Sequence, residues 1–489
     1  MQIGETVTIA DGSVGGRRSS LAAAFLGIPY ARATRLAPPL PPEPWTALDA
    51  REFGPAAPQP RRPSGDTVFG PPARVAEQCL NLNVWTPAAD TDAGLPVFVY
   101  IHGGGFVVGR SGTAALDGSR LAAAAGAVVV TLNYRLGSAG WCSHPDLAES
   151  ADASAGNWGL LDQIAALRWV QENIAVFGGD PGRVTLAGQS AGALSVIDLL
   201  AAPASAGLFA RAVLQSPPIA DAAAPAELVQ RWARALSREA TGSERFDPAA
   251  LRALTAEELS ALHDRALAAD EFRGTRGGAL PTIDAASLPR APMDDPAASP
   301  EVDVLLGTTA EEGTFFAYLA APPGEWSEQD LLARVGHLPG LDATRAAALV
   351  AQARAAVDGA GLEPRALFGR IATDALVVEP ALAWGRARAA AGSRVHRYRI
   401  DHPGPLANLG ATHSIDIGLM FATFTDDKTT RAFCGDGPAT ASASAALIDV
   451  IRAFVHGEEP GWSALDVSDG PDEVAVIGGD APWRIARDE

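Results

Sequence analysis

Residues 184–192, Val-Thr-Leu-Ala-Gly-Gln-Ser-Ala-Gly, are the part of the sequence that is most informative about the fold. The apolar residues at 184–187 predict a buried strand, and the apolar residues from Ala193 onward predict a helix. Gly188 and Gly192 stand two residues either side of Ser190, where a tight strand-to-helix turn leaves no room for side chains. Such a turn presents the hydroxyl at the end of the sheet, so we predict that Ser190 is a nucleophile. The alternative is a turn whose serine caps a helix.

A glycine-rich segment, His102-Gly103-Gly104-Gly105-Phe106, follows a second apolar strand pattern at 97–101. Acyl transfer develops negative charge on a carbonyl oxygen, and glycines let backbone N–H groups approach that oxygen without a β-carbon in the way. The N–H groups of Gly104, Gly105 and Ala191 are predicted to form this oxyanion hole. A bulky replacement of either glycine should then damage turnover more than folding. The alternative is a flexible glycine-rich turn.

A serine nucleophile needs a histidine base, and the base needs an acid that orients it. For a nucleophile on a strand-to-helix turn, the chain order is serine, acid, histidine. Of the eight histidines, His402, His413 and His456 follow the last predicted strand, and His456 stands beside glycine at a helix end. His413 stands between a small-residue loop (410–412) and an apolar segment (415–421), as expected of a base carried on a loop. His402 precedes a proline, which is typical of a turn residue.

The acid candidates follow a predicted strand at 302–307, in the run Thr308-Thr309-Ala310-Glu311-Glu312-Gly313. The carboxyl ends of strands are where open α/β sheets place their sites. A carboxylate here can therefore reach a histidine on a neighbouring loop. The residues alone leave Glu311 and Glu312 as equal candidates.

Short β-rich runs alternate with longer helical patterns, which favours an α/β sheet with helices on both faces. Several runs are continuous in Val, Ile and Leu, as in strands buried within a parallel sheet. Residues 220–300 show helices without a clear strand, and we expect an insertion over the sheet's edge or active-site end, with His263 on a solvated helix face. The predicted strands are 82–85, 97–102, 127–133, 184–187, 212–215, 302–307 and 395–400, and the predicted helices are 160–177, 191–201, 226–240, 344–357, 381–391 and 441–456.

We predict a single domain over residues 1–489, built on a central, mostly parallel, twisted sheet flanked by helices. The 47% hydrophobic composition is ample for a large buried core. Arg17 and Arg18 before an apolar run (21–28) imitate a targeting signal. The interpretation we favour is a buried strand at 25–30, because the apolar run is short and starts well inside the chain.

The formal net charge of −19 repels phosphate backbones and anionic lipid, so neither nucleic acid nor a membrane is expected as a partner. No run is long enough to span a bilayer. Cys79, Cys142 and Cys434 are odd in number and far apart, which implies neither a disulfide framework nor a metal site. We expect reduced thiols in a cytoplasmic protein, with secretion less favoured, that needs no metal or organic cofactor. A monomer or homodimer is expected.

The motifs resemble those of the type-B carboxylesterase/cholinesterase family through nearly the whole chain. Residues 25–31 (Phe-Leu-Gly-Ile-Pro-Tyr-Ala) resemble the family's first core strand, and 77–85 (Glu-Gln-Cys-Leu-Asn-Leu-Asn-Val-Trp) resemble its second signature. Residues 157–163 and 177–181 resemble the stretch that leads to the nucleophile. The resemblance, strongest to bacterial members of the para-nitrobenzyl esterase type, implies the α/β-hydrolase fold.

The resemblance also implies a catalytic triad. Glu312-Gly313, followed by Thr-Phe-Phe, is similar to the family's acid motif, in which the glutamate before glycine is catalytic. His413-Ser-Ile-Asp is similar to the family's catalytic-histidine motif. These matches imply that Ser190, Glu312 and His413 act together: the serine attacks an ester carbonyl, the histidine passes its proton to the leaving alcohol, and water resolves an acyl-enzyme.

Three positions depart from the family pattern. Gln189 stands where many relatives have a glutamate that helps cholinesterases attract cationic substrates, so a choline ester is not expected. Cys79 has no partner for the family's early disulfide, and Pro217-Pro218 replace a small pair at the pocket wall. Five residues are expected by position to line an apolar pocket, with ordinary core packing as the alternative for each: Phe106, Phe315, Phe316, Phe368 and Met420.

The predicted activity is hydrolysis of neutral, fairly apolar carboxylic esters by a serine carboxylesterase mechanism. A carbamate or amide hydrolase, or an acyltransferase, would use the same triad and is the first alternative. The second alternative is a catalytically silent binding module of the same fold. Such a module usually lacks a triad residue, whereas all three are present here.

Overall fold

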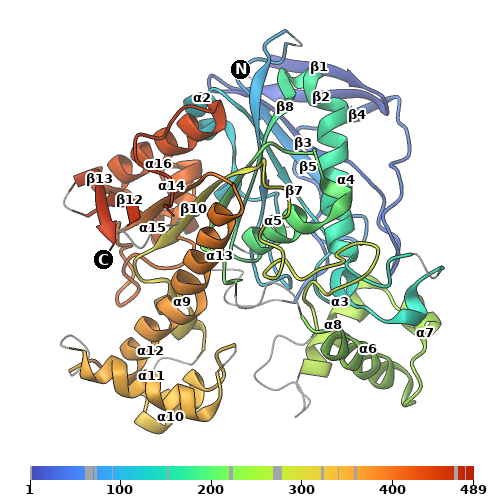
Figure 1. Cartoon of the computed structure of the whole chain (residues 1–489). Helices are drawn as coiled ribbons and strands as arrows, with labels where there is room; N and C mark the ends of the chain where they lie inside the picture. Colours follow the sequence, from blue (N-terminus) through green and yellow to red (C-terminus); the bar gives the residue numbers. More distant parts are fainter. Residues whose placement is uncertain are drawn as a thin grey trace.

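One large twisted sheet with helices on both faces forms the centre of the molecule (Figure 1). Strands from both ends of the chain lie in it, with β1 (Ile3–Ile9) at one edge and β13 (Ala481–Asp488) at the other. The computed structural model describes residues 3–60, 70, 74–90, 92–150, 153–219, 224–267, 278–320, 324–339, 341–356, 361–466, 472–479 and 481–488.

The strands follow the order β1-β2-β3-β5-β7-β6-β8-β9-β10-β11-β12-β13, and β4 pairs with β2. Neighbours from β7 to β12 are parallel, and the other neighbours on this path are antiparallel. All seven predicted strands are confirmed as β5 to β11, and the strand favoured at 25–30 is confirmed as β3. The bounds are β2 Gly12–Arg18, β3 Ala23–Pro29, β4 Ala47–Asp49, β5 Asn81–Thr86, β6 Leu95–Ile101, β7 Val128–Leu132, β8 Gly179–Gln189, β9 Arg211–Gln215, β10 Asp303–Thr309, β11 Val395–Ile400 and β12 Asp472–Gly478.

Alternate residues of β6 enter two separate cores. Val97 and Val99 face one apolar cluster, and Phe98 and Tyr100 face the other. Because side chains alternate along a strand, a sheet that is buried on both sides needs helices on both faces. The first cluster includes residues of α4 (Trp158–Asn173) and α5 (Ala191–Ala201), and the second includes residues of α2 (Ser119–Ala125), α14 (Ile415–Phe421) and α16 (Pro438–His456).

Buried polar side chains fasten α4 to its neighbours. Asp162 and Arg135 form a bidentate ion pair, with N–O distances of 2.7 and 2.8 Å, and both side chains are buried. Gln163 donates a hydrogen bond to Ser195 Oγ at 2.9 Å, which connects α4 to α5. One polar residue of the 157–163 motif, Gln163, therefore contacts the helix that follows the predicted nucleophile.

Two groups of helices stand at the same end of the sheet, on either side of the view in Figure 1. All six predicted helices are confirmed, as α4, α5, α6, α11, α13 and α16. The first group is α6 (Ala226–Thr241), α7 (Pro248–Ala253) and α8 (Ala256–Leu267), next to α3 (Gly137–Trp141); the second is α9 (Glu312–Leu319), α10 (Glu328–Val335), α11 (Ala343–Ala355) and α12 (Pro364–Ala372), which continues through the π-helical turn η7 (Thr373–Val378) into α13 (Glu379–Ala390). The remaining helix of the described chain with five or more residues is α15 (Lys428–Cys434).

The first group is the helical insertion expected within 220–300. Its described residues add no strand to the sheet. The prediction of a solvated His263 is wrong, because α8 packs against α3. The His263 side chain is buried, and its Nδ1 lies 2.9 Å from Ser138 Oγ.

Helix α16 is long and apolar enough to cross a membrane by length and composition, so the prediction that no run has the necessary length is wrong. In the structure this helix packs on the sheet. Leu447, Ile451 and Phe454 are buried in the second cluster, together with residues of β12. Its apolar face is thus covered by the protein's own core.

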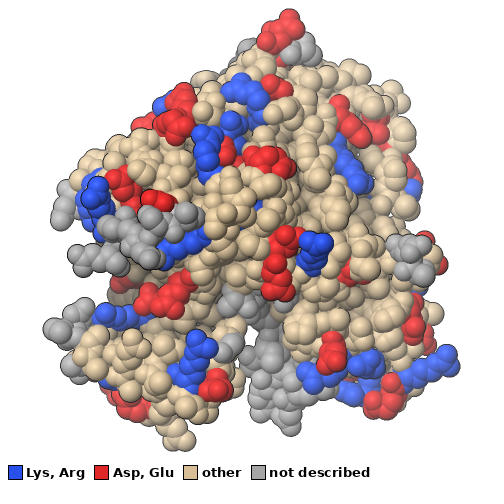
Figure 2. Space-filling model, viewed as in Figure 1, with Lys and Arg blue, Asp and Glu red and all other residues tan. Residues whose placement is uncertain are grey.

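Charged side chains of both signs are interspersed on the face that Figure 2 shows, with wide uncharged areas between them. Ion pairs also connect separate elements of the chain, as Arg120 of α2 pairs with Asp426 at 2.7 Å. The net negative charge is therefore not gathered into one patch on this face.

Candidate active site

Ser190 lies on a sharp turn between β8 and α5. Its φ of 57° and ψ of −123° are strained for a residue with a side chain. A hydrogen bond of 2.9 Å from its N–H to the Gln215 carbonyl oxygen ties the turn to β9. A β-carbon on Gly188 would collide with the Gly192 carbonyl, and one on Gly192 would collide with the carbonyl of Ile101. Ser190 is partly exposed between buried neighbours, so its hydroxyl is accessible.

His413 and Glu312 form a buried pair beside this turn. His413 Nδ1 lies 2.6 Å from Glu312 Oε2, and the two side chains are 2% and 0% exposed. This short distance is typical of a hydrogen bond from a ring N–H to a carboxylate. Because Nδ1 carries the donated hydrogen, Nε2 of the neutral ring is left as an acceptor. That is the form a general base needs.

The Glu312 carboxylate is held by the end of β10. Thr309 N donates to Oε1 at 2.7 Å, which leaves Oε2 for the histidine. The next residue, Gly313, donates its N–H to Thr373 Oγ1 at 2.9 Å. A β-carbon on Gly313 would collide with the carbonyl of Gly369 and lie 2.6 Å from Thr373 N. Glycine at this position therefore allows α12 and η7 to pack against the start of α9.

Glu311, the other acid candidate, holds the loop that carries the histidine. Its N–H donates to the Ala411 carbonyl at 2.9 Å, and its Oε2 accepts from Ala411 N at 2.7 Å. Thr314 Oγ1 lies 2.8 Å from Thr412 Oγ1, which adds a second tie. The two adjacent glutamates thus differ in geometry. Glu312 contacts the ring, and Glu311 contacts the backbone just before it.

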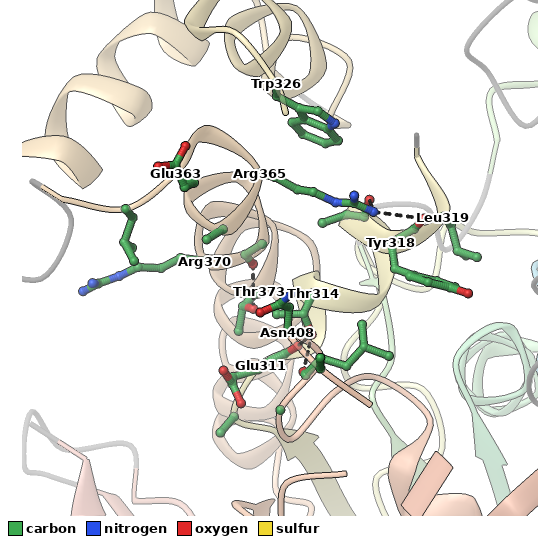
Figure 3. A pocket seen from close by; sticks show the side chains of 18 of the residues that line it. Glu311, Thr314, Tyr318, Leu319, Trp326, Glu363, Arg365, Arg370, Thr373 and Asn408 are labelled. Atoms are coloured by element: carbon green, nitrogen blue, oxygen red, sulfur yellow. Dashed lines mark hydrogen bonds between the residues drawn. The ribbon is translucent and has the colours of Figure 1, made fainter. Parts of the chain in front are cut away.

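An open groove of about 1880 Å³ borders these ties. Figure 3 shows Glu311, Thr314 and Asn408 close together at one end of it, and Arg365 reaching toward the end of α9. Arg365 donates to the Ala317 carbonyl at 3.1 Å. None of the described residues that line the groove belongs to the predicted triad. The groove therefore adjoins the histidine loop without containing the reacting groups.

Three backbone N–H groups point to an oxyanion hole. Those of Gly104, Gly105 and Ala191 have no hydrogen-bond acceptor among the described residues. Ala191 is the first residue of α5, where helical N–H groups lack intrahelical partners. The glycine loop lies directly against the nucleophile, since a β-carbon on Gly103 would be 3.1 Å from Ser190 Cβ. The glycine loop and the start of α5 therefore both adjoin Ser190, as the predicted oxyanion hole requires.

The two glycines of this hole differ in the space around them. A β-carbon on Gly104, where φ is 112°, would collide with the carbonyl oxygen of Val108. One on Gly105, where φ is 63°, would meet no atom of the described residues within 4 Å. The expectation that replacement spares folding therefore does not extend to Gly104, because a side chain there has no room.

Two of the five predicted pocket residues, Phe315 and Phe316, lie beside His413, the predicted catalytic base. The ring centroids of Phe315 and Phe316 are 5.8 and 5.0 Å from that of His413. Phe315 is buried, and Phe316 is partly exposed. They form an apolar wall beside the histidine ring.

The other three predicted pocket residues are packed in cores. Phe106 is fully buried, with its ring centroid 4.7 Å from that of Trp141. Phe368 packs on Trp326 within the cluster of α10, α11 and α12, and Met420 lies in the cluster beneath α16. Core packing, the alternative expected for each of the five, is thus observed for all three, and their contact with a substrate stays a prediction.

A contact that sequence reasoning missed joins Gln189 to the histidine. Gln189 Nε2 lies 3.0 Å from His413 Nε2, and both side chains are buried. Among the described residues, no hydrogen bond joins Ser190 Oγ to His413. The sequence marks Gln189 only as a departure in charge, because a contact between residues 224 positions apart leaves no local pattern.

Buried titratable groups outside the triad have shifted pKa values. Burial, reinforced by the nearby Glu312 carboxylate, raises the pKa of Asp416 to about 8, although Gln215 donates to it at 2.8 Å. Burial lowers the pKa of His102 to about 4, so that this residue before the glycines is neutral at neutral pH. No three His, Cys, Asp or Glu side chains of the described ranges gather as metal ligands do.

Comparison with known proteins gives consistent matches over most of the chain. The model of the carboxylesterase family matches residues 4–466. The chain is 32% identical to a para-nitrobenzyl esterase of Bacillus subtilis (strain 168) over 486 residues, which cover 96% of this chain and 91% of that protein. It is also 32% identical to a phenmedipham hydrolase of Pseudarthrobacter oxydans, with 98% and 95% covered.

Solved structures match equally far. A thermophilic PNB esterase has a TM-score of 0.83 and 30% identity, with 99% of this chain and 98% of the other covered. A carboxylesterase of Geobacillus stearothermophilus has a TM-score of 0.83 and 29% identity, with the same coverage. The likeness therefore includes both sheet edges and the two groups of helices.

Proposed function

The chain belongs to the carboxylesterase family and is a carboxylic ester hydrolase of the α/β-hydrolase fold, and from that premise we propose which residues act and on which esters. Ser190 is the nucleophile, His413 the base, and Glu312 the acid that orients the base. The observation that carries this assignment is the buried His413–Glu312 hydrogen bond of 2.6 Å beside a partly exposed serine on a strained turn.

Each step of the proposed reaction can be assigned to a side chain or a backbone N–H group of the site. Ser190 Oγ attacks the ester carbonyl carbon while His413 Nε2 accepts the hydroxyl proton. The negative charge on the carbonyl oxygen is met by the N–H groups of Gly104, Gly105 and Ala191. The imidazolium gives its proton to the leaving alcohol as the bond to it breaks. Water, deprotonated by the same histidine, then releases the acid and restores Ser190.

The substrates are proposed to be neutral and fairly apolar esters. Gln189 puts an amide, and not a carboxylate, next to the nucleophile, and Phe315 and Phe316 add apolar surface at the base. The amide at 189 gives a cationic group on the substrate no negative charge with which to pair. The names of the relatives, a para-nitrobenzyl esterase and a phenmedipham hydrolase, describe those proteins and leave this chain's own ester to be measured.

The test is hydrolysis of p-nitrophenyl esters from acetate to laurate by the wild type, Ser190→Ala and a matched control, Ser195→Ala. Ser195 lies one helical turn further along α5 and is fully buried, so it has no access to substrate. We expect Ser190→Ala to lower turnover about 10⁴-fold or more and Ser195→Ala to stay within tenfold of the wild type. A folded wild type that leaves every ester intact but cleaves carbamates or amides would overturn the substrate class.

Cytoplasmic location and a monomeric or homodimeric state are part of the same proposal. The support for the location is that Cys79, Cys142 and Cys434 are all buried and free. Cell fractionation and mass spectrometry of the N-terminus test the location, and sedimentation tests the oligomeric state. A protein recovered from the medium with a cleaved N-terminus would contradict the cytoplasmic assignment.

A further inference from the structure

The Nε2 atom of His413 has two potential hydrogen-bond donors and one lone pair. Glu312 accepts the hydrogen of Nδ1, so Nε2 can accept a single hydrogen bond. Gln189 Nε2 makes that bond at 3.0 Å. For catalysis the same lone pair has to accept the proton of Ser190 Oγ. The amide and the hydroxyl therefore compete for one atom.

We infer that Gln189 is a positioning residue that occupies the base before an ester binds and yields it to Ser190 during acylation. The inference rests on the proposed roles of Ser190 and His413. It assigns to Gln189 a part in the reaction that is separate from its lack of charge, because it depends on the hydrogen that the amide donates.

The residues around Gln189 hold its amide where it competes with Ser190 for Nε2 of His413. Its side chain is 1% exposed, and its Oε1 would lie 2.8 Å from a β-carbon on Gly103. The amide thus fills the space between the oxyanion loop and His413, where only glycine at 103 leaves room for it. Gly103 also lies against the nucleophile, since its β-carbon would be 3.1 Å from Ser190 Cβ. An ester bound at Ser190 therefore adjoins the segment that packs on the amide, and we assign release of the base to that binding step.

The residue type at position 189 then determines whether Nε2 of His413 is free, hydrogen-bonded or protonated. Methionine has a similar length but no hydrogen to donate, so it leaves Nε2 free for Ser190. Glutamate accepts a hydrogen bond and favours a protonated ring, which cannot act as a base. Of the nearby titratable groups, Glu312 on α9 is hydrogen-bonded to this ring. Asp416 on α14 lies near the Glu312 carboxylate, and burial together with that carboxylate raises the pKa of Asp416 to about 8.

The experiment compares wild type, Gln189→Met and Gln189→Glu in the full chain, from pH 5 to pH 9. The readouts are kcat/KM for p-nitrophenyl acetate and the rate of inactivation by a fluorophosphonate, which reports the reactivity of Ser190 in the free enzyme. Gln163→Met is the control, because Gln163 is an equally buried amide that bonds Ser195. Circular dichroism establishes that each variant is folded.

We expect Gln189→Met to raise both rates about two- to tenfold at pH 7, the worth of one hydrogen bond. Gln189→Glu should lower both rates about tenfold at pH 6 and return toward the wild-type value at pH 9. Gln163→Met should stay within twofold. The opposite effects of two replacements at one position are not expected of an amide that only supports the fold.

Equal losses in Gln189→Met and Gln189→Glu at every pH would overturn the inference. If Gln189→Met does not fold, the near-isosteric Gln189→Glu is the deciding variant. A pH profile of kcat/KM whose acidic midpoint is the same in Gln189→Glu as in the wild type would contradict the role of Gln189. Ser190→Ala in the same assay separates this from the proposed function. Retained activity in Ser190→Ala would contradict the proposed triad. An inactive Ser190→Ala together with unaffected Gln189 variants would contradict only the role inferred for Gln189.

Discussion

Glu311 and Glu312 are neighbours with different tasks, which a pair of amide substitutions distinguishes. In Glu312→Gln the amide no longer favours the correct tautomer of His413, and we expect kcat to fall about 10³-fold or more. In Glu311→Gln the amide oxygen can still accept the Ala411 N–H, so activity should stay within tenfold. Steady-state kinetics on one p-nitrophenyl ester decides this. A crippling Glu311→Gln with a mild Glu312→Gln would reverse the assignment of the acid.

Gly105→Ala isolates the oxyanion hole from the fold. The added methyl group enters open space, so the free energy of unfolding should fall by no more than about 2 kcal/mol, the cost of a positive φ. Alanine relieves this strain by rotating away from the positive φ, which turns the backbone N–H group and should lower kcat about 10²-fold. Gly104→Ala is the contrasting variant, since its clash with Val108 should lower both stability and activity. Unchanged kcat in a folded Gly105→Ala would exclude its N–H from the hole.

The residues of the site differ in how far sequence reveals them. Ser190 could be predicted as the nucleophile from its neighbours in the sequence, because the strand, the two glycines and the helix are contiguous. The choice of Glu312 and His413 depends on resemblance to a family. The Gln189–His413 contact was not predictable, since it depends on side-chain conformations in segments that only the folded sheet brings together.

At the level of elements, the start of α9 depends on a glycine. In Gly313→Ala the methyl group would collide with the carbonyl of Gly369, and either α9 or α12 has to move. We expect a loss of about 1–3 kcal/mol in the free energy of unfolding, measured with urea, and a fall in kcat, because Glu312 is the preceding residue. Gly369→Ala is the control, since its β-carbon would make only ordinary contacts. Equal effects of the two variants would contradict this account of the packing.

The elements that sequence reasoning found are those with a strong local pattern. The parallel strands are continuous apolar runs, and α4 and α16 show helical periodicity. The edge strand β13 was missed because its apolar Trp483 and Ile485 point to solvent and form no buried face. Helix α9 was missed for the opposite reason. Most of its residues are apolar, so no period stands out.

At the scale of the whole molecule, Asp416 makes stability depend on pH. Its pKa is raised from 3.8 to about 8, so the folded state keeps a proton that the unfolded state loses. Stability from this group is therefore fully present below about pH 4 and declines as pH rises toward 8, by up to about 1.4 kcal/mol per pH unit. Urea unfolding of wild type and Asp416→Asn across this range should show a smaller decline in the variant. Parallel curves would contradict the prediction.

In the proposed reaction, Ser190 carries the acyl group between the two halves of the cycle. Rapid mixing with p-nitrophenyl butyrate, acid quenching and mass spectrometry of the digested protein would detect this acyl-enzyme. We expect a transient butyryl adduct on the peptide that contains Ser190, formed with a burst of about one p-nitrophenol per chain, and neither signal in Ser190→Ala. An adduct on another residue, or steady turnover by Ser190→Ala, would contradict the claim.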